Sequence, residues 1–121
     1  MIRVYIASPY TNGDKEENVN LQIDVANELL NRDFAPYVPT LAHFIEARHP
    51  RKEYDWLKLD FEYLALCHFV VRIRPFKNGK EIISPGADKE EEYAKKLGIP
   101  VHTFNTIEDV CKYLDEHFYN V

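Results

Sequence analysis

The regular alternation of strand-like and helix-like segments restricts most strongly what this chain can fold into. Runs rich in β-branched and aromatic residues predict strands at 2–7, 34–40, 69–74 and 99–104. Segments with helical periodicity follow these runs at 14–31, 54–66, 86–97 and 106–117. This order predicts a doubly wound α/β fold, flavodoxin- or Rossmann-like, with a mostly parallel sheet of four to five strands and helices on both faces.

Local signals refine this outline. Two prolines weaken the second strand and favour an edge position for it. Residues 41–51 are expected to be irregular or to form a short helix. Asn78 and Gly79 predict a turn in the loop 75–84. The first helix is expected to place one apolar face inward, made of Val19, Ile23, Ala26 and Leu30.

Length and composition limit the classes of protein to consider. The 121 residues suit a single domain spanning 1–121, and a formal net charge of -5 gives no footprint for duplex nucleic acid. Cys67 and Cys111 show no disulfide or metal spacing, which favours the reducing cytoplasm. We expect no signal peptide and no membrane span. We also expect neither a metal nor a cofactor, because no phosphate-binding glycine loop is present and four histidines match no zinc pattern: His43, His49, His68 and His102.

Ligands of parallel α/β folds bind at the carboxyl ends of the strands, which directs attention to the segments 7–13 and 75–90. At about 100° per residue, Glu90 falls on the apolar face of its helix. That face also contains Ala87, Tyr93, Ala94 and Leu97. The opposite, solvent-facing arc is expected to contain Asp88, Lys89, Glu91, Glu92, Lys95 and Lys96. A carboxylate in an apolar stripe costs free energy unless it is paired or used.

A second acid repeats this pattern, because Asp60 lies between Trp56 and Leu64 on the apolar arc of its helix. Either acid alone is compatible with a structural role, as the partner of an arginine or as a cap of nearby backbone. Two such acids beside one central strand suit glycosidic chemistry. One carboxylate can stay ionised beside an electron-poor sugar carbon, while burial lets the other hold a proton for the leaving group.

Several stretches resemble the nucleoside 2-deoxyribosyltransferase superfamily, including its deoxynucleoside 5′-monophosphate N-glycosidases. Ser84, Gly86 and Glu90 match the Ser-x-Gly-x-x-x-Glu signature of the N-glycosidase branch. The stretch VYIASPYTNG places Tyr5 at the position of an active-site tyrosine, and LDFEYLALCHFVV places Asp60 at that of an acid. AKKLGIPV matches the closing helix and strand. The resemblance covers nearly the whole chain and is closest to small uncharacterised members.

The resemblance implies an enzyme that cleaves or transfers the N-glycosidic bond of nucleosides or their 5′-monophosphates. Glu90 would attack C1′ of the sugar or stabilise its oxocarbenium-like state, and Tyr5 would orient Glu90 through its hydroxyl. Asp60 would protonate the leaving base, with its pKa raised by burial and by the charge of Glu90. The resemblance also implies a homo-oligomer, a dimer or larger, in which a neighbouring subunit donates an asparagine; Asn105 and Asn120 are the candidates.

At the 5′ end of the substrate, the resemblance implies contacts from Ser8, Ser84, Gly86 and the amides at that helix start. Because position 84 holds no acid, a 5′-monophosphate is expected to be preferred over a free nucleoside. Tyr10 stands where the phosphate-handling branch carries an arginine. Four basic residues either replace that arginine or form only a solvated loop: Arg72, Arg74, Lys77 and Lys80.

Two hypotheses of different class remain. The first is the N-glycosidic enzyme, and the second is a non-catalytic module that binds a nucleotide or small metabolite on the same fold. The acid pair favours the enzyme, because a binder of an anionic nucleotide gains little from two buried carboxylates.

Overall fold

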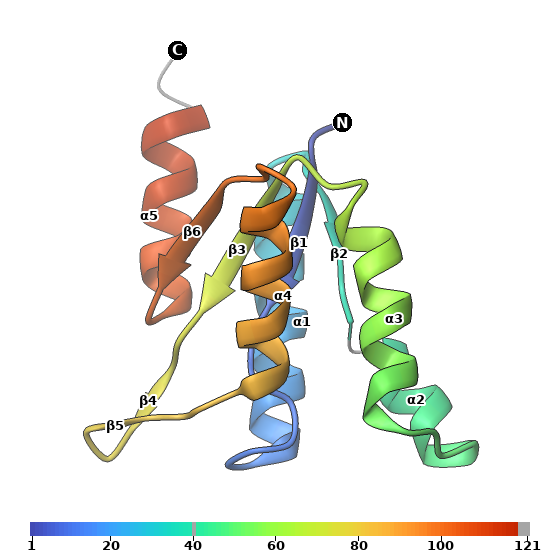
Figure 1. Cartoon of the computed structure of the whole chain (residues 1–121). Coiled ribbons are helices and arrows are strands. Elements are labelled where there is room, and N and C mark those ends of the chain that lie inside the picture. The colour runs from blue at the N-terminus through green and yellow to red at the C-terminus, as the bar shows by residue number, and fades with distance from the viewer. Residues whose placement is uncertain (40, 119–121) are drawn as a thin grey trace.

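The computed structural model describes residues 1–39 and 41–118, and the four strands of its main sheet are separated by helices (Figure 1). The main sheet consists of β1 (Arg3–Ala7), β2 (Ala35–Tyr37), β3 (Phe69–Ile73) and β6 (Val101–Phe104). A short hairpin consists of β4 (Phe76–Lys77) and β5 (Lys80–Glu81). The helices are α1 (Lys15–Asn31), α2 (Leu41–Arg48), α3 (Glu53–Leu64), α4 (Pro85–Lys96) and α5 (Ile107–Phe118).

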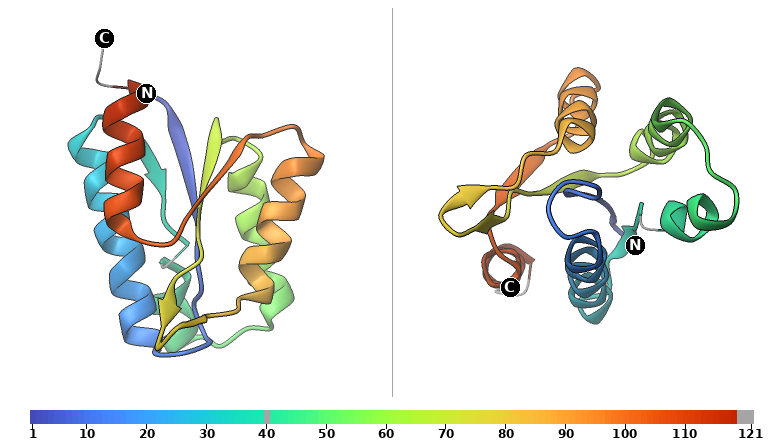
Figure 2. Two further views of the ribbon diagram at one scale, coloured as in Figure 1. Left: turned by 90° about the vertical axis from the view of Figure 1, so that its left-hand side faces the viewer. Right: turned by 90° about the horizontal axis from the view of Figure 1, so that it is seen from below.

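The main sheet is parallel throughout, with the strand order β2-β1-β3-β6. Helices α1 and α5 cover one face of it, and α3 and α4 cover the other (Figure 2). The predicted doubly wound α/β fold is therefore confirmed, and β2 lies at the edge as its prolines indicated. The chain leaves β1 toward one edge and β3 toward the other, so the switch point of the sheet lies between these two strands.

Strand alternation divides the core into two layers. Val4 and Ile6 of β1 pack with Val71 of β3 against α1 and α5. The alternate residues Tyr5 and Ala7 face α3 and α4 instead. All five of these side chains are buried, which is what a parallel sheet covered on both faces requires.

The turn, the helix cap and the short helix that the sequence suggested are all present. Asn78 and Gly79 both have positive φ, 54° and 77°, which is the backbone of a two-residue hairpin turn. At the start of α1, Asp14 caps the helix by accepting the N–H of Glu17 at 3.1 Å. The segment that was expected to be irregular or a short helix forms α2.

Arg72 of β3 is fully buried and faces α4, which anchors this helix to the sheet. Its Nη2 lies 2.8 Å from Asp88 Oδ1, and its Nε lies 3.3 Å from Glu91 Oε1. Glu91 also pairs with Arg74 and Lys95, and its side chain is only 14% exposed. The expectation that Glu91 faces solvent is therefore wrong, because Glu91 pairs with the buried Arg72 of β3.

We expect Glu91→Ala to lower the free energy of unfolding by about 1–3 kcal/mol, because it leaves the buried guanidinium of Arg72 with one carboxylate fewer. Urea denaturation measures this loss. Glu92→Ala is the matched control, since Glu92 lies next to it on α4 and is exposed. Equal stability of the two variants would contradict the anchoring role.

Candidate active site

A cavity of about 550 Å³ opens at the edge of the sheet where the parallel strands end. Helices α1, α3 and α4 all begin at this edge, so their N-terminal turns surround the cavity (Figure 1). Its wall includes the β1–α1 loop, part of α2 and the start of α4. Six of the seven predicted site residues line it: Ser8, Tyr10, Asp60, Ser84, Gly86 and Glu90. Strand order and helical phase thus bring together residues that are far apart in the sequence.

Glu90 lies on the buried face of α4, as its helical phase predicted. It is 6% exposed, beside the buried Ala87 and Ala94. Burial raises the pKa of its carboxyl to about 8. Its Oε2 is buried and has no hydrogen-bond partner among the described residues. Leu97, which was predicted on the same face, is 47% exposed, because α4 ends at Lys96 and the chain turns away there.

Asp60 is the second buried acid and lies on α3. Tyr37 of β2 donates its hydroxyl to Asp60 Oδ1 at 3.2 Å. Burial raises the pKa of Asp60 to about 6, and the hydrogen bond from Tyr37 opposes this rise. The charge of Glu90 was expected to raise the pKa of Asp60 as well, but this effect is not found. Burial keeps Glu90 protonated, and hence uncharged, in the pH range in which Asp60 titrates.

Tyr5 is connected to this site through other aromatic residues. It is fully buried on β1 and lies opposite Tyr37 in the register of β1 and β2. The two rings stack at 5.3 Å, and Tyr37 also stacks on Tyr63 of α3 at 4.6 Å. The hydroxyl of Tyr5 has no hydrogen-bond partner among the described residues, so the expected bond to Glu90 is not formed. Tyr37, which holds Asp60, was not predicted from the sequence.

The first turn of α4 has fewer free amides than the sequence suggested. Ser84 caps the helix by accepting the N–H of Ala87 at 3.2 Å, and its carbonyl accepts the N–H of Asp88. Pro85 has no N–H. Gly86 is left as the one residue of this turn whose amide has no acceptor within the helix.

Gly86 is not required by packing within the described chain. A Cβ at this position would meet Glu53 Oε1 at 3.8 Å, which is an ordinary van der Waals contact, and no other described atom within 4 Å apart from those of its chain neighbours and its own helix backbone. The absence of a side chain keeps the backbone of α4 accessible from the cavity.

The β1–α1 loop supplies Ser8 and Tyr10 to the cavity. Ser8 Oγ accepts a hydrogen bond from Gln22 Nε2 at 2.7 Å. The hydroxyl of Tyr10 lies 2.5 Å from His43 Nδ1, which joins this loop to α2. Neither of these two contacts was predicted from the sequence. His43 belongs to a segment with no clear periodicity, so only the structure places it beside Tyr10.

The spacing of Asn18 and Gln22 places both on one face of α1, but the apolar residues of this helix suggested a different inward face. Ile23 and Leu30 were expected to face inward but are 45% and 56% exposed. Asn18 and Gln22 are buried instead. Asn18 Nδ2 donates to two carbonyl oxygens of the β1–α1 loop, so polar contacts with the site loop share the inward face of α1 with its buried apolar residues. Val19 and Ala26 are buried as predicted.

The basic residues proposed to replace the missing loop arginine do not line the cavity. Arg72 and Arg74 pair with Asp88 and Glu91, Lys77 pairs with Glu17, and Lys80 is exposed in the hairpin. The basic residues that line the cavity are Lys15, Arg51 and Lys89. Four acidic residues also line it: Glu46, Glu53, Asp60 and Glu90. The cavity wall therefore has no excess of positive charge.

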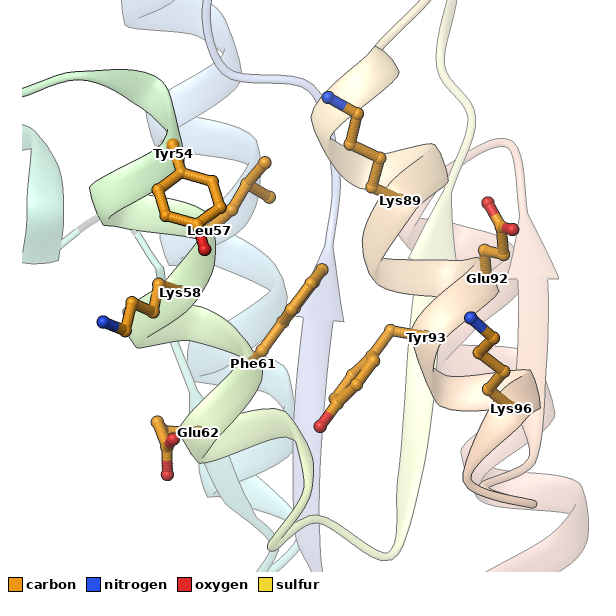
Figure 3. Close-up of a pocket in the computed structure, with 9 residues that line it drawn as sticks. All are labelled: Tyr54, Leu57, Lys58, Phe61, Glu62, Lys89, Glu92, Tyr93 and Lys96. Atoms are coloured by element: carbon orange, nitrogen blue, oxygen red, sulfur yellow. The ribbon is translucent and has the colours of Figure 1, made fainter.

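A second hollow of about 570 Å³ lies between α3 and α4 (Figure 3). None of the predicted site residues lines it. Phe61 and Tyr93 face one another across it, with stacked rings 4.3 Å apart. Phe61 adjoins Asp60 in the sequence, and Tyr93 lies one turn beyond Glu90 on α4. This stack packs together the two helices that carry the candidate catalytic acids.

Metal binding has no support in the described part of the chain. Within residues 1–39 and 41–118, no group of three or more histidine, cysteine, aspartate or glutamate side chains is placed to hold a metal ion. Among the helices described, none combines the length and apolar character needed to cross a membrane. Asn105 donates to the carbonyl of Arg74 and does not line the cavity, while Asn120 lies outside the described residues.

Comparison with known sequences gives a family. The profile of a domain of unknown function, DUF7768, matches residues 2–104. The chain belongs to this family. No curated protein matches this DUF7768 chain.

Solved structures of nucleoside enzymes resemble this DUF7768 protein. A 2-deoxyribosyltransferase of Bacillus psychrosaccharolyticus has a TM-score of 0.61 at 20% identity, over 92% of this chain and 91% of that one. A 2-deoxyribosyltransferase of Leishmania mexicana gives 0.61 and 20%, over 87% and 65%. The CMP N-glycosidase BcmB of Clostridium botulinum gives 0.58 and 16%, over 95% and 99%. The predicted resemblance is thus confirmed at the level of the fold.

Proposed function

We propose that this DUF7768 protein is an enzyme that cleaves or transfers the N-glycosidic bond of nucleosides or their 5′-monophosphates. The observation that carries the proposal is the pair of buried carboxyls, Glu90 and Asp60, which line one cavity at the carboxyl ends of the strands. Buried carboxyls with raised pKa values in a cleft are typical of acid–base and nucleophilic sites. The similar folds of two deoxyribosyltransferases and an N-glycosidase support a sugar–base bond as the target.

In the proposed reaction, a carboxylate oxygen of Glu90 attacks C1′ of the sugar as the bond from C1′ to the base nitrogen breaks. The bonding electrons leave with the base, which takes a proton from Asp60. Water or a second base then attacks C1′ and gives a proton to Asp60 as the bond from C1′ to Glu90 breaks, so that the product is a free sugar or a new nucleoside. Tyr37 holds the carboxyl of Asp60 in place. Tyr5 is proposed to orient Glu90. This role requires the hydroxyl of Tyr5 to form a hydrogen bond that it does not make to any described residue of this structure.

The pKa values set a condition on this assignment. The reaction needs Glu90 ionised and Asp60 protonated, whereas burial raises their pKa values to about 8 and about 6. At pH 7 only about one molecule in a hundred holds both required forms. A sugar hydroxyl that donates to Glu90 Oε2 would favour the carboxylate and increase this fraction, because a hydrogen bond to the charged form lowers a pKa.

The direct test is release of free base from a panel of deoxynucleosides and their 5′-monophosphates, followed by chromatography. We expect release from at least one member, and a second nucleobase in the mixture distinguishes transfer from hydrolysis. Binding of these compounds without any release would support the non-catalytic module instead.

A further inference from the structure

We infer that Glu53 is a specificity-determining residue that makes the cavity select a free 5′-hydroxyl over a 5′-phosphate. This inference rests on the proposed function and names the substrate class of the same site. Glu53 is the first residue of α3 and lines the cavity. It comes from a different element than Ser84, the position at which the sequence was noted to hold no acid.

The position of the Glu53 carboxylate is the main observation. A Cβ on Gly86 would lie 3.8 Å from Glu53 Oε1, so this oxygen lies beside the first turn of α4. The only amide of that turn without an acceptor in the helix belongs to Gly86 itself. A helix N-terminus favours one anion, and here a protein carboxylate already lies next to it.

A second observation shows that this end of α4 faces a ligand site. Glu90, one and a half turns along the same helix, lines the same cavity and is 6% exposed. Its Oε2 has no hydrogen-bond partner among the described residues. Gly86 lies four residues before Glu90 on α4, and both line the cavity. The inference places C1′ of the substrate beside Glu90 and its 5′ end against the wall that Ser84 and Gly86 form.

The charges of the cavity wall lead to the same preference. Burial keeps Glu90 mostly neutral at pH 7, so three basic residues face three ionised acids, and none of the arginines of β3 and its following loop reaches the cavity. A phosphate beside Glu53 would meet a like charge. A free 5′-hydroxyl can instead donate a hydrogen bond to that carboxylate.

The test compares base release from a deoxynucleoside and its 5′-monophosphate in the wild type, Glu53→Gln and Glu62→Gln. Glutamine keeps the size of the side chain and removes its charge. Glu62 is an exposed acid of the same helix that lines the outer hollow between α3 and α4 and not the cavity, so it is the matched control. The wild type is expected to prefer the nucleoside. Glu53→Gln is expected to shift the ratio of kcat/KM values toward the monophosphate by about ten- to a hundredfold, whereas Glu62→Gln leaves it unchanged.

Calorimetric binding of 2-deoxyribose 5-phosphate gives a readout that does not depend on turnover. Glu53→Gln should bind this compound at least about tenfold more tightly than the wild type does. If no substrate releases base but this gain is found, the proposed reaction fails and the role of Glu53 stands. Equal use of nucleoside and monophosphate by the wild type, or equal ratios in the two variants, would overturn the inference.

Discussion

Glu90→Ala is expected to lower base release by about a thousandfold or more, because it removes the proposed nucleophile. Glu92→Ala, on the same helix but exposed, should leave activity within about twofold of the wild type. Glu91 is unsuitable as the control, since it pairs with the buried Arg72. Chromatographic measurement of kcat/KM for both variants tests the assignment, and similar losses in the two would refute it.

The same substitution has an expected effect on stability that needs no substrate. The pKa of Glu90 is raised from its ordinary value to about 8 in the folded state, so the folded chain holds a proton that the unfolded chain has lost. The contribution of Glu90 to the free energy of unfolding must therefore fall as pH rises from about 4.5 to about 8, by about 3 kcal/mol up to pH 7. Glu90→Ala should lack this decline and keep only the smaller one that the raised pKa of Asp60 causes. Urea denaturation at pH 5 and pH 7 measures the difference between the two proteins, and parallel pH dependences would show that Glu90 is not buried as a neutral acid.

Asp60→Asn is expected to lower base release by about a hundredfold or more on ordinary nucleobases, because asparagine cannot donate a proton to the leaving nitrogen. The loss should be much smaller on p-nitrophenyl 2-deoxyriboside, whose leaving group needs no protonation. A uniform loss on both substrates would indicate that Asp60 only positions Glu90 or the sugar.

The pH profile of the Asp60→Asn variant determines which acid has which role. With pKa values of about 8 for Glu90 and about 6 for Asp60, the wild type should have a profile that rises to pH 6, stays level to pH 8 and then falls. If Glu90 is the nucleophile, the residual kcat/KM of Asp60→Asn rises with pH through about 8, because only ionisation of Glu90 is then required. A residual activity that falls through the same range would make Glu90 the proton donor and reverse the roles.

The sequence predicted the fold and most of the candidate site because both depend on short-range periodicity. The strand–helix order predicted the parallel sheet, and the prolines of β2 predicted its place at the edge. A step of about 100° per residue predicted that Glu90 and Asp60 face inward. Strand ends of a parallel sheet meet at one edge, so these acids and the β1–α1 loop had to lie near one another.

The tertiary structure alone decided which side chains from different elements meet. Tyr37 can donate its hydrogen bond to Asp60 because parallel pairing puts β2 beside β1. The periodicity within either strand does not predict that contact. Glu91 leaves the solvent arc because Arg72 lies across from it on β3.

Glu53 is the clearest case of what the sequence could not determine. Position 84 holds no acid. The packing of α3 against α4 nevertheless brings the carboxylate of Glu53, a residue far earlier in the chain, beside the same helix start. Periodicity fixes the direction of a side chain relative to its own helix or strand. The distance between two elements, and hence the charge that a substrate meets, is set only when their side chains pack together.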